Sequence, residues 1–196
     1  MILANANIDA FLAGWFHERL SPAFAAFLQV LSGPGSDFCI FSLVIFTALL
    51  LTWTRSWYAL LALLLTVPGG ALFGEMLKLI IQRPRPFIAG PFGEWGGYSF
   101  PSGHTIAATL FYGFLAVLIA EGLRKRESRY WRFLPFFISA ILITGVGFSR
   151  IALGAHYFTD VLAAMILGTL WIAACMMTVA TIRRLTISPA PEASTI

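Results

Sequence analysis

The chain has 196 residues, of which 59% are hydrophobic and 11% are charged, and its formal net charge is +4 at pH 7. Its mean hydropathy is +0.83. Soluble domains average about 25% charged residues, so a water-soluble fold could not hide this much apolar surface. The composition excludes an ordinary soluble domain and predicts a single membrane-embedded unit over residues 1–196. The basic residues are divided among several loops without an interleaved pattern, which argues against a nucleic-acid partner.

The N-terminal region, residues 1–36, is expected to lie in the membrane interface. It begins MILANANIDAFLAGWF, which lacks a basic segment and a long apolar run, so it does not resemble a cleaved signal peptide. Over 8–31 the apolar pattern is broken by the His-Glu-Arg run at 17–19 and by Pro22. Charges in mid-span are costly, which favours two short interfacial helices over a further membrane crossing.

Five stretches approach the length of about 20 predominantly apolar residues that a spanning helix needs. They are residues 37–53, 57–81, 104–120, 133–151 and 160–182. Pro68 and the paired glycines after it predict a kink in the second stretch. Cys39 and Cys175 lie in apolar runs and are expected to be buried free thiols. The predicted fold is an all-α, polytopic membrane helix bundle with about five transmembrane helices plus N-terminal interfacial helices, ending in a disordered tail over 186–196.

The distribution of Lys and Arg predicts the orientation of the bundle. Five basic residues lie in the loop 121–132, EGLRKRESRYWR, and two more lie at 183–184. The positive-inside rule places both segments in the cytoplasm, together with the short turn at Arg55. Loops 82–103 and 152–159 then face outward together. We therefore expect a multi-pass protein of the inner (plasma) membrane with a cytoplasmic C-terminus.

The first polar stretch beside the outward loops is KLIIQRPRP, residues 78–86. Lys78 ends the second span, and Arg83 and Arg85 each precede a proline. Basic side chains commonly snorkel at helix ends, so lipid-headgroup anchoring is one interpretation. These cations lie on the side that the positive-inside rule disfavours, and the Arg-Pro-Arg-Pro backbone is stiff. Both facts favour guanidinium groups held in fixed directions.

The second polar stretch is FPSGHT, residues 100–105, at the start of the third span. Ser102 can cap this helix, whose free N–H groups and positive dipole end form an anion site. Gly103 lets a ligand approach the main chain closely, and His104 projects from the first turn. The alternative is a plain helix cap followed by an interfacial histidine.

The third polar stretch is SRIALGAHYFTD, residues 149–160. Arg150 ends the fourth span, and a carboxylate follows His156 by four residues. These two side chains share a face once the segment is helical. Asp160 could then accept the imidazole N–H, fix the tautomer and raise the basicity of the other nitrogen. The alternative is an interfacial His–Asp pair with an anchoring arginine.

Together the three stretches place cations, a helix N-terminus and two histidines at one membrane face. Fixed cations can neutralise a phosphate dianion and its developing charge. One histidine can attack phosphorus while the other protonates the leaving oxygen. The sequence has no Asp/Glu cluster that suggests a magnesium or zinc site, so neither a metal nor another cofactor is expected.

In order and spacing, the three stretches resemble the three motifs of the type 2 phosphatidic acid phosphatase (lipid phosphate phosphatase) superfamily. The matching residues are Lys78 with Arg85-Pro86, then PSGH at 101–104, then Ser149-Arg150 with His156 and Asp160. No motif position departs from the pattern, and the helical layout extends the likeness to most of the chain.

The resemblance implies a role for each matching residue. His156 would be the nucleophile that forms a phosphohistidine, Asp160 would orient it, and His104 would protonate the leaving group. The phosphate oxygens would be held, without a metal, by Lys78, Arg85, Ser102, Gly103 and Arg150. Arg83 lies outside the motif and is kept only as a candidate headgroup contact.

The expected function is removal of a terminal phosphate from a lipid phosphate or pyrophosphate at the outer face of the membrane. Family analogy ranks undecaprenyl pyrophosphate and phosphatidylglycerol phosphate first, with phosphatidic acid and lipid A also open. The expected partners are this substrate and the membrane lipids, and the oligomeric state is left open. A first alternative is transfer of the phosphoryl group to another lipid.

A second alternative is an anion or lipid transporter. Transport would need polar residues through the bilayer, whereas the span interiors contain little beyond Thr, Ser, Gly and Glu75. Glu75 is expected either to pair with a nearby basic residue or to be a buried structural acid. The resembling fold also occurs in soluble vanadate-dependent haloperoxidases, and the five apolar spans argue against that chemistry.

Overall fold

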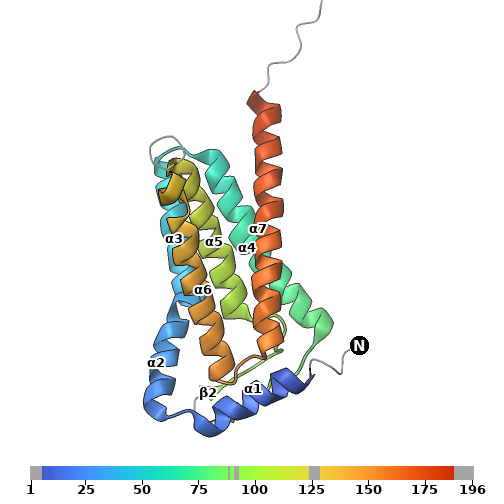
Figure 1. The fold of residues 1–196 in the computed structure, drawn as a ribbon. Coiled ribbons are helices and arrows are strands. Elements are labelled where there is room, and N and C mark those ends of the chain that lie inside the picture. The colour runs from blue at the N-terminus through green and yellow to red at the C-terminus, as the bar shows by residue number, and fades with distance from the viewer. Residues whose placement is uncertain (1–5, 88, 91–92, 124–128, 188–196) are drawn as a thin grey trace, which may run out of the picture.

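Five long helices form the body of this multi-pass membrane protein (Figure 1). The structure, a computed structural model, describes residues 6–87, 89–90, 93–123 and 129–187. The long helices are α3 (Asp37–Trp53), α4 (Trp57–Ile81), α5 (Gly103–Leu123), α6 (Leu134–Ala152) and α7 (Phe158–Ile187). They confirm the five predicted spans. The disordered tail was predicted over 186–196, but residues 186–187 still belong to α7, so the prediction is wrong there. Residues 188–196 fall outside the described residues.

Two short helices precede α3: α1 (Ala6–Arg19) and α2 (Pro22–Ser32). The sequence predicted two short helices here, and their interfacial position stays a prediction. The Ser21 hydroxyl accepts the Phe24 N–H at 3.3 Å and so caps α2. Whereas α1 lies across the end of the bundle, α2 runs on toward α3 through the single turn η1 (Gly33–Gly35) (Figure 1). Because this turn interrupts the helical direction so little, the first candidate span extends over Pro22–Trp53 and not only over 37–53.

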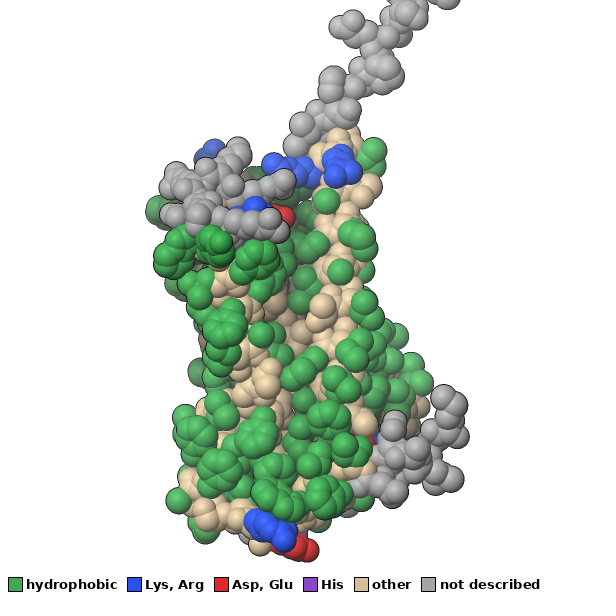
Figure 2. Space-filling view, in the orientation of Figure 1, with side chains coloured by type: hydrophobic (Ala, Val, Ile, Leu, Met, Phe, Trp, Pro, Cys, Tyr) green, Lys and Arg blue, Asp and Glu red, His purple; other side chains and the backbone are tan. Residues whose placement is uncertain are grey.

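Helix α5 is at the centre of the bundle and packs against α4, α6 and α7. Its side chains Leu110, Phe111 and Phe114 are almost fully buried. A Cβ on Gly168 of α7 would lie 2.8 Å from Thr109 Cγ2 of α5, so the absence of a side chain lets these two helices approach closely. The outer surface is also apolar, and Figure 2 shows hydrophobic side chains covering the body of the bundle. This surface suits a lipid solvent.

Pro68 lies inside α4, which remains helical from Trp57 to Ile81. The Trp171 indole of α7 donates a hydrogen bond to the Leu65 carbonyl at 3.1 Å, one turn before Pro68. A side chain of the neighbouring helix α7 thus donates a hydrogen bond to a backbone carbonyl close to the proline. Bonds of this kind allow a proline inside a membrane helix. Cys39 and Cys175 are free thiols, half-buried and buried respectively.

The two loops that the sequence places at one face do lie together at one end of the bundle (Figure 1). The loop between α4 and α5 contains a short antiparallel pair, β1 (Ala89–Gly90) and β2 (Gly93–Glu94). The link between α6 and α7 passes beside it, since Arg85 donates to the Ala155 carbonyl at 2.9 Å. Helix α1 covers the same end. This end is therefore built from three segments distant in sequence: the loop between α4 and α5, the link between α6 and α7, and helix α1.

Candidate active site

A pocket of about 280 Å³ opens among these loops at the end of the bundle. Six of the eight predicted site residues line it: Lys78, Arg85, Gly103, His104, Arg150 and His156. The other two, Ser102 and Asp160, are completely buried beside it. The two histidines therefore share one pocket, as a two-histidine phosphoryl mechanism requires.

The His156 imidazole is held in one tautomer. Nδ1 lies 2.7 Å from the Ser99 carbonyl oxygen, which can only accept, so Nδ1 carries the proton. Nε2 lies 3.3 Å from Arg85 Nη1, which can only donate, so Nε2 presents its lone pair. Burial, together with the charges of Arg85 and Arg150, lowers the pKa of His156, and Asp160 opposes this shift. The geometry favours a neutral imidazole whose Nε2 carries the lone pair.

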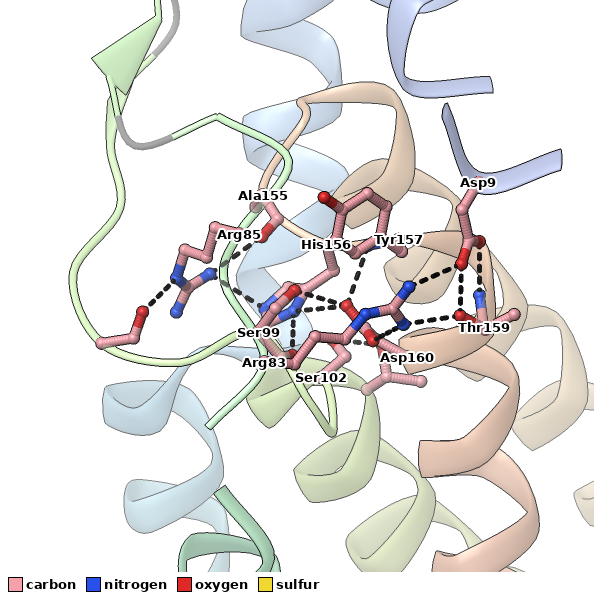
Figure 3. A network of polar contacts seen from close by, with 12 residues as sticks. Asp9, Arg83, Arg85, Ser99, Ser102, Ala155, His156, Tyr157, Thr159 and Asp160 are labelled. Carbon is pink, nitrogen blue, oxygen red and sulfur yellow. Dashed lines mark hydrogen bonds and ion pairs between the residues drawn. The ribbon is translucent and has the colours of Figure 1, made fainter. Parts of the chain in front are cut away.

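Asp160 does not accept the His156 N–H, contrary to the prediction. Its Oδ2 is 3.8 Å from His156 Nδ1, beyond hydrogen-bond distance. His156 lies in the turn before α7 and not within the helix, so the spacing of four residues brings the two groups near each other without a hydrogen bond between them. The Asp160 carboxylate instead accepts from Ser99 Oγ and from the Tyr157 N–H at 3.0 Å (Figure 3). Asp160 is thus linked to His156 through Ser99, whose hydroxyl group donates to Asp160 and whose carbonyl binds the imidazole.

Arg83 is the residue that the sequence reasoning misjudged. Its Nη1 donates to Thr159 Oγ1 at 2.7 Å and to Asp160 Oδ1 at 2.5 Å, and its Nη2 donates to Asp9 at 2.8 Å. Burial opposes its charge, but the two carboxylates raise the pKa of Arg83. With both terminal nitrogens bound to protein, the side chain is not placed for a headgroup contact. The only signal was the stiff Arg-Pro pair, and nothing in the sequence linked it to Asp9.

Arg85 is fixed by main-chain carbonyl groups. Nη1 donates to Ala155, and Nε donates to Gly96 at 3.0 Å and Gly97 at 3.2 Å. Burial lowers the pKa of Arg85. Among the described residues no carboxylate forms an ion pair with it. Its direction is therefore fixed while its positive charge stays available to a ligand.

Arg150 also lacks a carboxylate partner among the residues described. Its side chain is buried, its Nη1 donates to Ser32 Oγ at 3.1 Å, and its guanidinium lies 4.6 Å from the centre of the Trp95 ring. Arg150 Nε is buried without a hydrogen-bond partner in the described part of the chain. A buried donor without a partner is rare, and here it belongs to a residue that lines the pocket. An anionic ligand would satisfy it.

Lys78 reaches the start of α5. A Cβ on Gly103 would lie 3.2 Å from Lys78 Nζ, so glycine permits this close approach. The ammonium group pairs with Glu75 Oε1 at 2.6 Å, and the Glu75 side chain is 65% exposed. Of the two roles left open for Glu75, pairing with a basic residue is therefore correct and a buried structural acid is wrong.

Ser102 and His104 flank Gly103 at the start of α5. The Ser102 hydroxyl lies 2.9 Å from Thr105 Oγ1 and does not line the pocket, so its phosphate contact stays a prediction. Its N–H donates to the Asp160 carbonyl at 3.3 Å, which ties α5 to α7. His104 lines the pocket from the first helical turn. Within the described residues there is no group of three or more His, Cys, Asp or Glu side chains that could hold a metal ion.

Comparison with solved structures identifies this fold. The crystal structure of a transmembrane PAP2-type phosphatidylglycerolphosphate phosphatase from Bacillus subtilis superimposes with a TM-score of 0.80, at 25% identity, covering 93% of this chain and 89% of that one. Residues 56–184 match the PAP2 superfamily. The chain therefore belongs to the PAP2 superfamily.

Two relatives come from Bacillus subtilis strain 168. Phosphatidylglycerophosphatase B is 33% identical over 136 residues, which cover 69% of this chain and 65% of that protein. Undecaprenyl-diphosphatase BcrC is 33% identical over 104 residues, which cover 51% of this chain and 47% of that protein. The chain thus aligns with about half to two thirds of the length of these relatives.

Proposed function

We propose that this protein hydrolyses the terminal phosphate of a membrane lipid phosphate or pyrophosphate. The observation that carries the proposal is the pocket in which Lys78, Arg85 and Arg150 meet two histidines. Two of these cations have no carboxylate partner in the described residues, and one offers an unused buried donor. A phosphate dianion supplies the charge and the acceptor oxygens that such a pocket lacks.

In the first step, the three cations and the N-terminus of α5 bind the phosphate oxygens. His156 Nε2 attacks phosphorus, and the bond from phosphorus to the leaving oxygen breaks. His104 gives its proton to that oxygen, which departs as the lipid alcohol or lipid phosphate. The Ser99 carbonyl keeps its hydrogen bond to Nδ1–H and stabilises the positive charge that develops on the ring.

In the second step, the neutral His104 takes a proton from water, and the resulting hydroxide attacks phosphorus. The bond from phosphorus to Nε2 breaks, and inorganic phosphate leaves. His156 returns to its neutral tautomer and His104 to its protonated form. The cycle uses only side chains and water, so no cofactor takes part.

The substrate proposal draws on the relatives. Their names specify phosphatidylglycerophosphatase and undecaprenyl-diphosphatase activities, which support phosphatidylglycerol phosphate and undecaprenyl pyrophosphate as first candidates. The apolar outer surface continues to the end of the bundle that holds the pocket (Figure 2). A lipid tail can lie along this surface while its headgroup enters the pocket.

The site is proposed to face the outside of an inner membrane. The arginines at 183–184 lie near the C-terminal end of α7, the end opposite the pocket. The Arg183 guanidinium carbon is 6.0 Å from the centre of the Tyr58 ring, three residues after Arg55, and the short helix η2 (Arg129–Arg132) precedes α6 at the same end. The positive-inside rule places that end in the cytoplasm. Accessibility labelling of a cysteine introduced in each loop of intact cells tests this orientation.

The activity is tested by phosphate release from purified protein in detergent, against a panel of lipid phosphates and pyrophosphates. Hydrolysis predicts inorganic phosphate without an added acceptor lipid. Release that needs an acceptor, with the phosphoryl group recovered on it, would indicate phosphotransfer instead. No turnover of any lipid phosphate would contradict the proposal and favour a binding or transport role. Excess EDTA is expected to leave the rate unchanged, and a loss restored by a metal would overturn the metal-free mechanism.

A further inference from the structure

Helix α1 touches the site through one buried acid. Asp9 is 2% exposed, although it lies in a helix at the end of the bundle. Its Oδ1 accepts the Thr159 N–H at 3.1 Å, and its Oδ2 accepts from Thr159 Oγ1 at 2.6 Å and from Arg83 Nη2 at 2.8 Å (Figure 3). Asp9 therefore holds both the first turn of α7 and an arginine from the loop after α4.

Arg83 joins two carboxylates, Asp9 and Asp160, that lie 151 positions apart in the sequence. One end of its planar fork binds Asp9 and the other binds Asp160. The fork is stacked on Tyr157, with the guanidinium carbon 4.1 Å from the ring centre. A guanidinium presents its donors in fixed relative directions, so the position of one carboxylate constrains the other.

Asp160 passes this constraint to the two segments that flank the His156 imidazole. It accepts from Ser99 Oγ, and the carbonyl of the same serine binds His156 Nδ1. It also accepts from the N–H of Tyr157, the residue after His156. Neither Asp9 nor Arg83 lines the pocket, so neither is in place to touch a bound phosphate.

We propose that Asp9, Arg83 and Asp160 form a latch through which helix α1 holds the His156 imidazole in its attacking orientation. The inference rests on the proposed function, in which His156 is the nucleophile. Asp9 and Arg83 are positioning residues. Their loss should lower the rate of the chemical step and leave phosphate binding by the pocket cations nearly unchanged.

The latch also affects the electrostatic environment of His156, because the Arg83 charge compensates the nearby Asp160 carboxylate. The charged and titratable groups that face this imidazole are Arg85 from the loop after α4, His104 from α5, Arg150 from α6 and Asp160 from α7. Removal of the Arg83 charge leaves the Asp160 carboxylate less compensated. The negative charge then favours a protonated His156, so its titration midpoint should rise.

The test compares Asp9→Asn with Glu18→Gln in the intact chain. Glu18 is a matched control because it is an acid of the same helix whose side chain is 72% exposed and pairs only with its exposed neighbour Arg19 in the described structure. Asp9→Asn is expected to lower kcat by about 10²-fold, the scale of a misplaced reacting group, with KM nearly unchanged. Glu18→Gln should keep both constants. An unchanged kcat in Asp9→Asn, or a loss confined to KM, would overturn the latch.

Arg83 supplies a second variant in case Asp9→Asn does not fold. Arg83→Lys keeps the charge but loses the fork, so it should show the same selective fall in kcat, measured well below the melting temperature of the variant. The double variant Asp9→Asn with Arg83→Lys should be little slower than either single one, because both break the same unit. If the falls in kcat of the two single variants multiply in the double variant, the two residues act separately, which would contradict the latch.

A measurement without turnover separates this inference from the proposed function. The readout is the titration midpoint of the His156 imidazole, followed by NMR. The chain has three histidines, so single substitutions at His17 and His104 assign the signal of each one. The His156 midpoint should rise in Arg83→Gln and stay in place in Glu18→Gln. An unmoved midpoint in Arg83→Gln would overturn the latch even if the enzyme is active. Failure of the wild-type protein to release phosphate would overturn the proposed function. The latch would then still be tested by this titration, which does not depend on turnover.

Discussion

The body of the bundle and its pocket end use polar side chains in opposite ways. In the spans, most threonine hydroxyl groups bind their own helix: Thr169 donates to the Met165 carbonyl at 2.7 Å, and Thr178 donates to Ala174 at 2.9 Å. Ser139 is an exception, since it donates to the Tyr112 carbonyl of a neighbouring helix at 2.9 Å. At the pocket end, polar groups bind across the chain. Arg83 and Asp160 are 77 residues apart, and Asp9 and Thr159 are 150 residues apart.

The difference follows from the solvent. Lipid offers no hydrogen-bond partner, so a hydroxyl group in a span is satisfied most simply by the carbonyl four residues earlier. Such a bond contributes nothing to the arrangement of the helices. At the pocket end the loops leave the regular helices, and their charged groups need partners from other segments. Those bonds determine where the site residues lie.

The largest expected effect is loss of the nucleophile. His156→Ala should lower phosphate release by about 10⁴-fold or more, the scale seen when a hydrolase loses a residue of its catalytic unit. The fold should persist, as measured by melting temperature in detergent. The control is His17→Ala, whose imidazole stacks on Phe87 outside the pocket lining. Near-normal phosphate release from His156→Ala would refute the assignment of the nucleophile.

Loss of one pocket cation should cost less. Single alanine substitutions at Lys78, Arg85 and Arg150 are each expected to lower kcat/KM by about 10²–10³-fold, because each removes a donor to the developing phosphate charge. Phosphate release at several substrate concentrations measures this. A cation whose loss changes the rate by no more than about threefold would be excluded from the phosphate site.

Two glycines of α5 offer a sharper comparison between the two regions. A Cβ on Gly103 would lie 3.2 Å from Lys78 Nζ, whereas a Cβ on Gly122 would meet nothing within 4 Å. Gly103→Ala should displace the Lys78 ammonium by a few tenths of an ångström and lower kcat/KM by about tenfold, less than a full 1 Å misplacement costs. Gly122→Ala should keep activity and stabilise the helix by about 0.5–1 kcal/mol. Equal activity in both variants would contradict the close approach.

The pH dependence should report the environment of His156. Burial, with the charges of Arg85 and Arg150, lowers its pKa below the ordinary value of 6.5. The neutral imidazole is the nucleophile, so activity is present above the folded-state pKa and is lost as the pH falls through it. The acid limb of kcat/KM is therefore expected below pH 6.5. A limb at or above that value would contradict the buried, cation-flanked imidazole.

The smallest effect is expected in the body of the bundle. Thr178→Val removes a hydroxyl group that binds only its own helix in the described structure. Activity should stay within about twofold, and the free energy of unfolding should change by about 0.5 kcal/mol or less. A large loss of phosphate release would mean that the spans take part in the chemistry, and the contrast between the two regions would fail.

Composition and motif spacing were enough to predict the spans and most of the pocket. Apolar stretches of the required length become helices because lipid leaves the backbone no other way to satisfy its hydrogen bonds. The convergence of Lys78, Arg85, His104, Arg150 and His156 followed from placing the outward loops at one face. The prediction that Asp160 accepts the His156 N–H was wrong, because a turn and not a helix joins the two residues.

What the sequence alone determined is the membrane bundle and the inventory of charged groups at one end of it, since both depend on local patterns and on the lipid solvent. What only the tertiary structure decided is which of those groups touch. The Ser99 carbonyl binds His156, and Arg83 links Asp9 to Asp160. Contacts between residues so far apart depend on how the helices pack and how the loops close over them, and no periodicity in the chain encodes that.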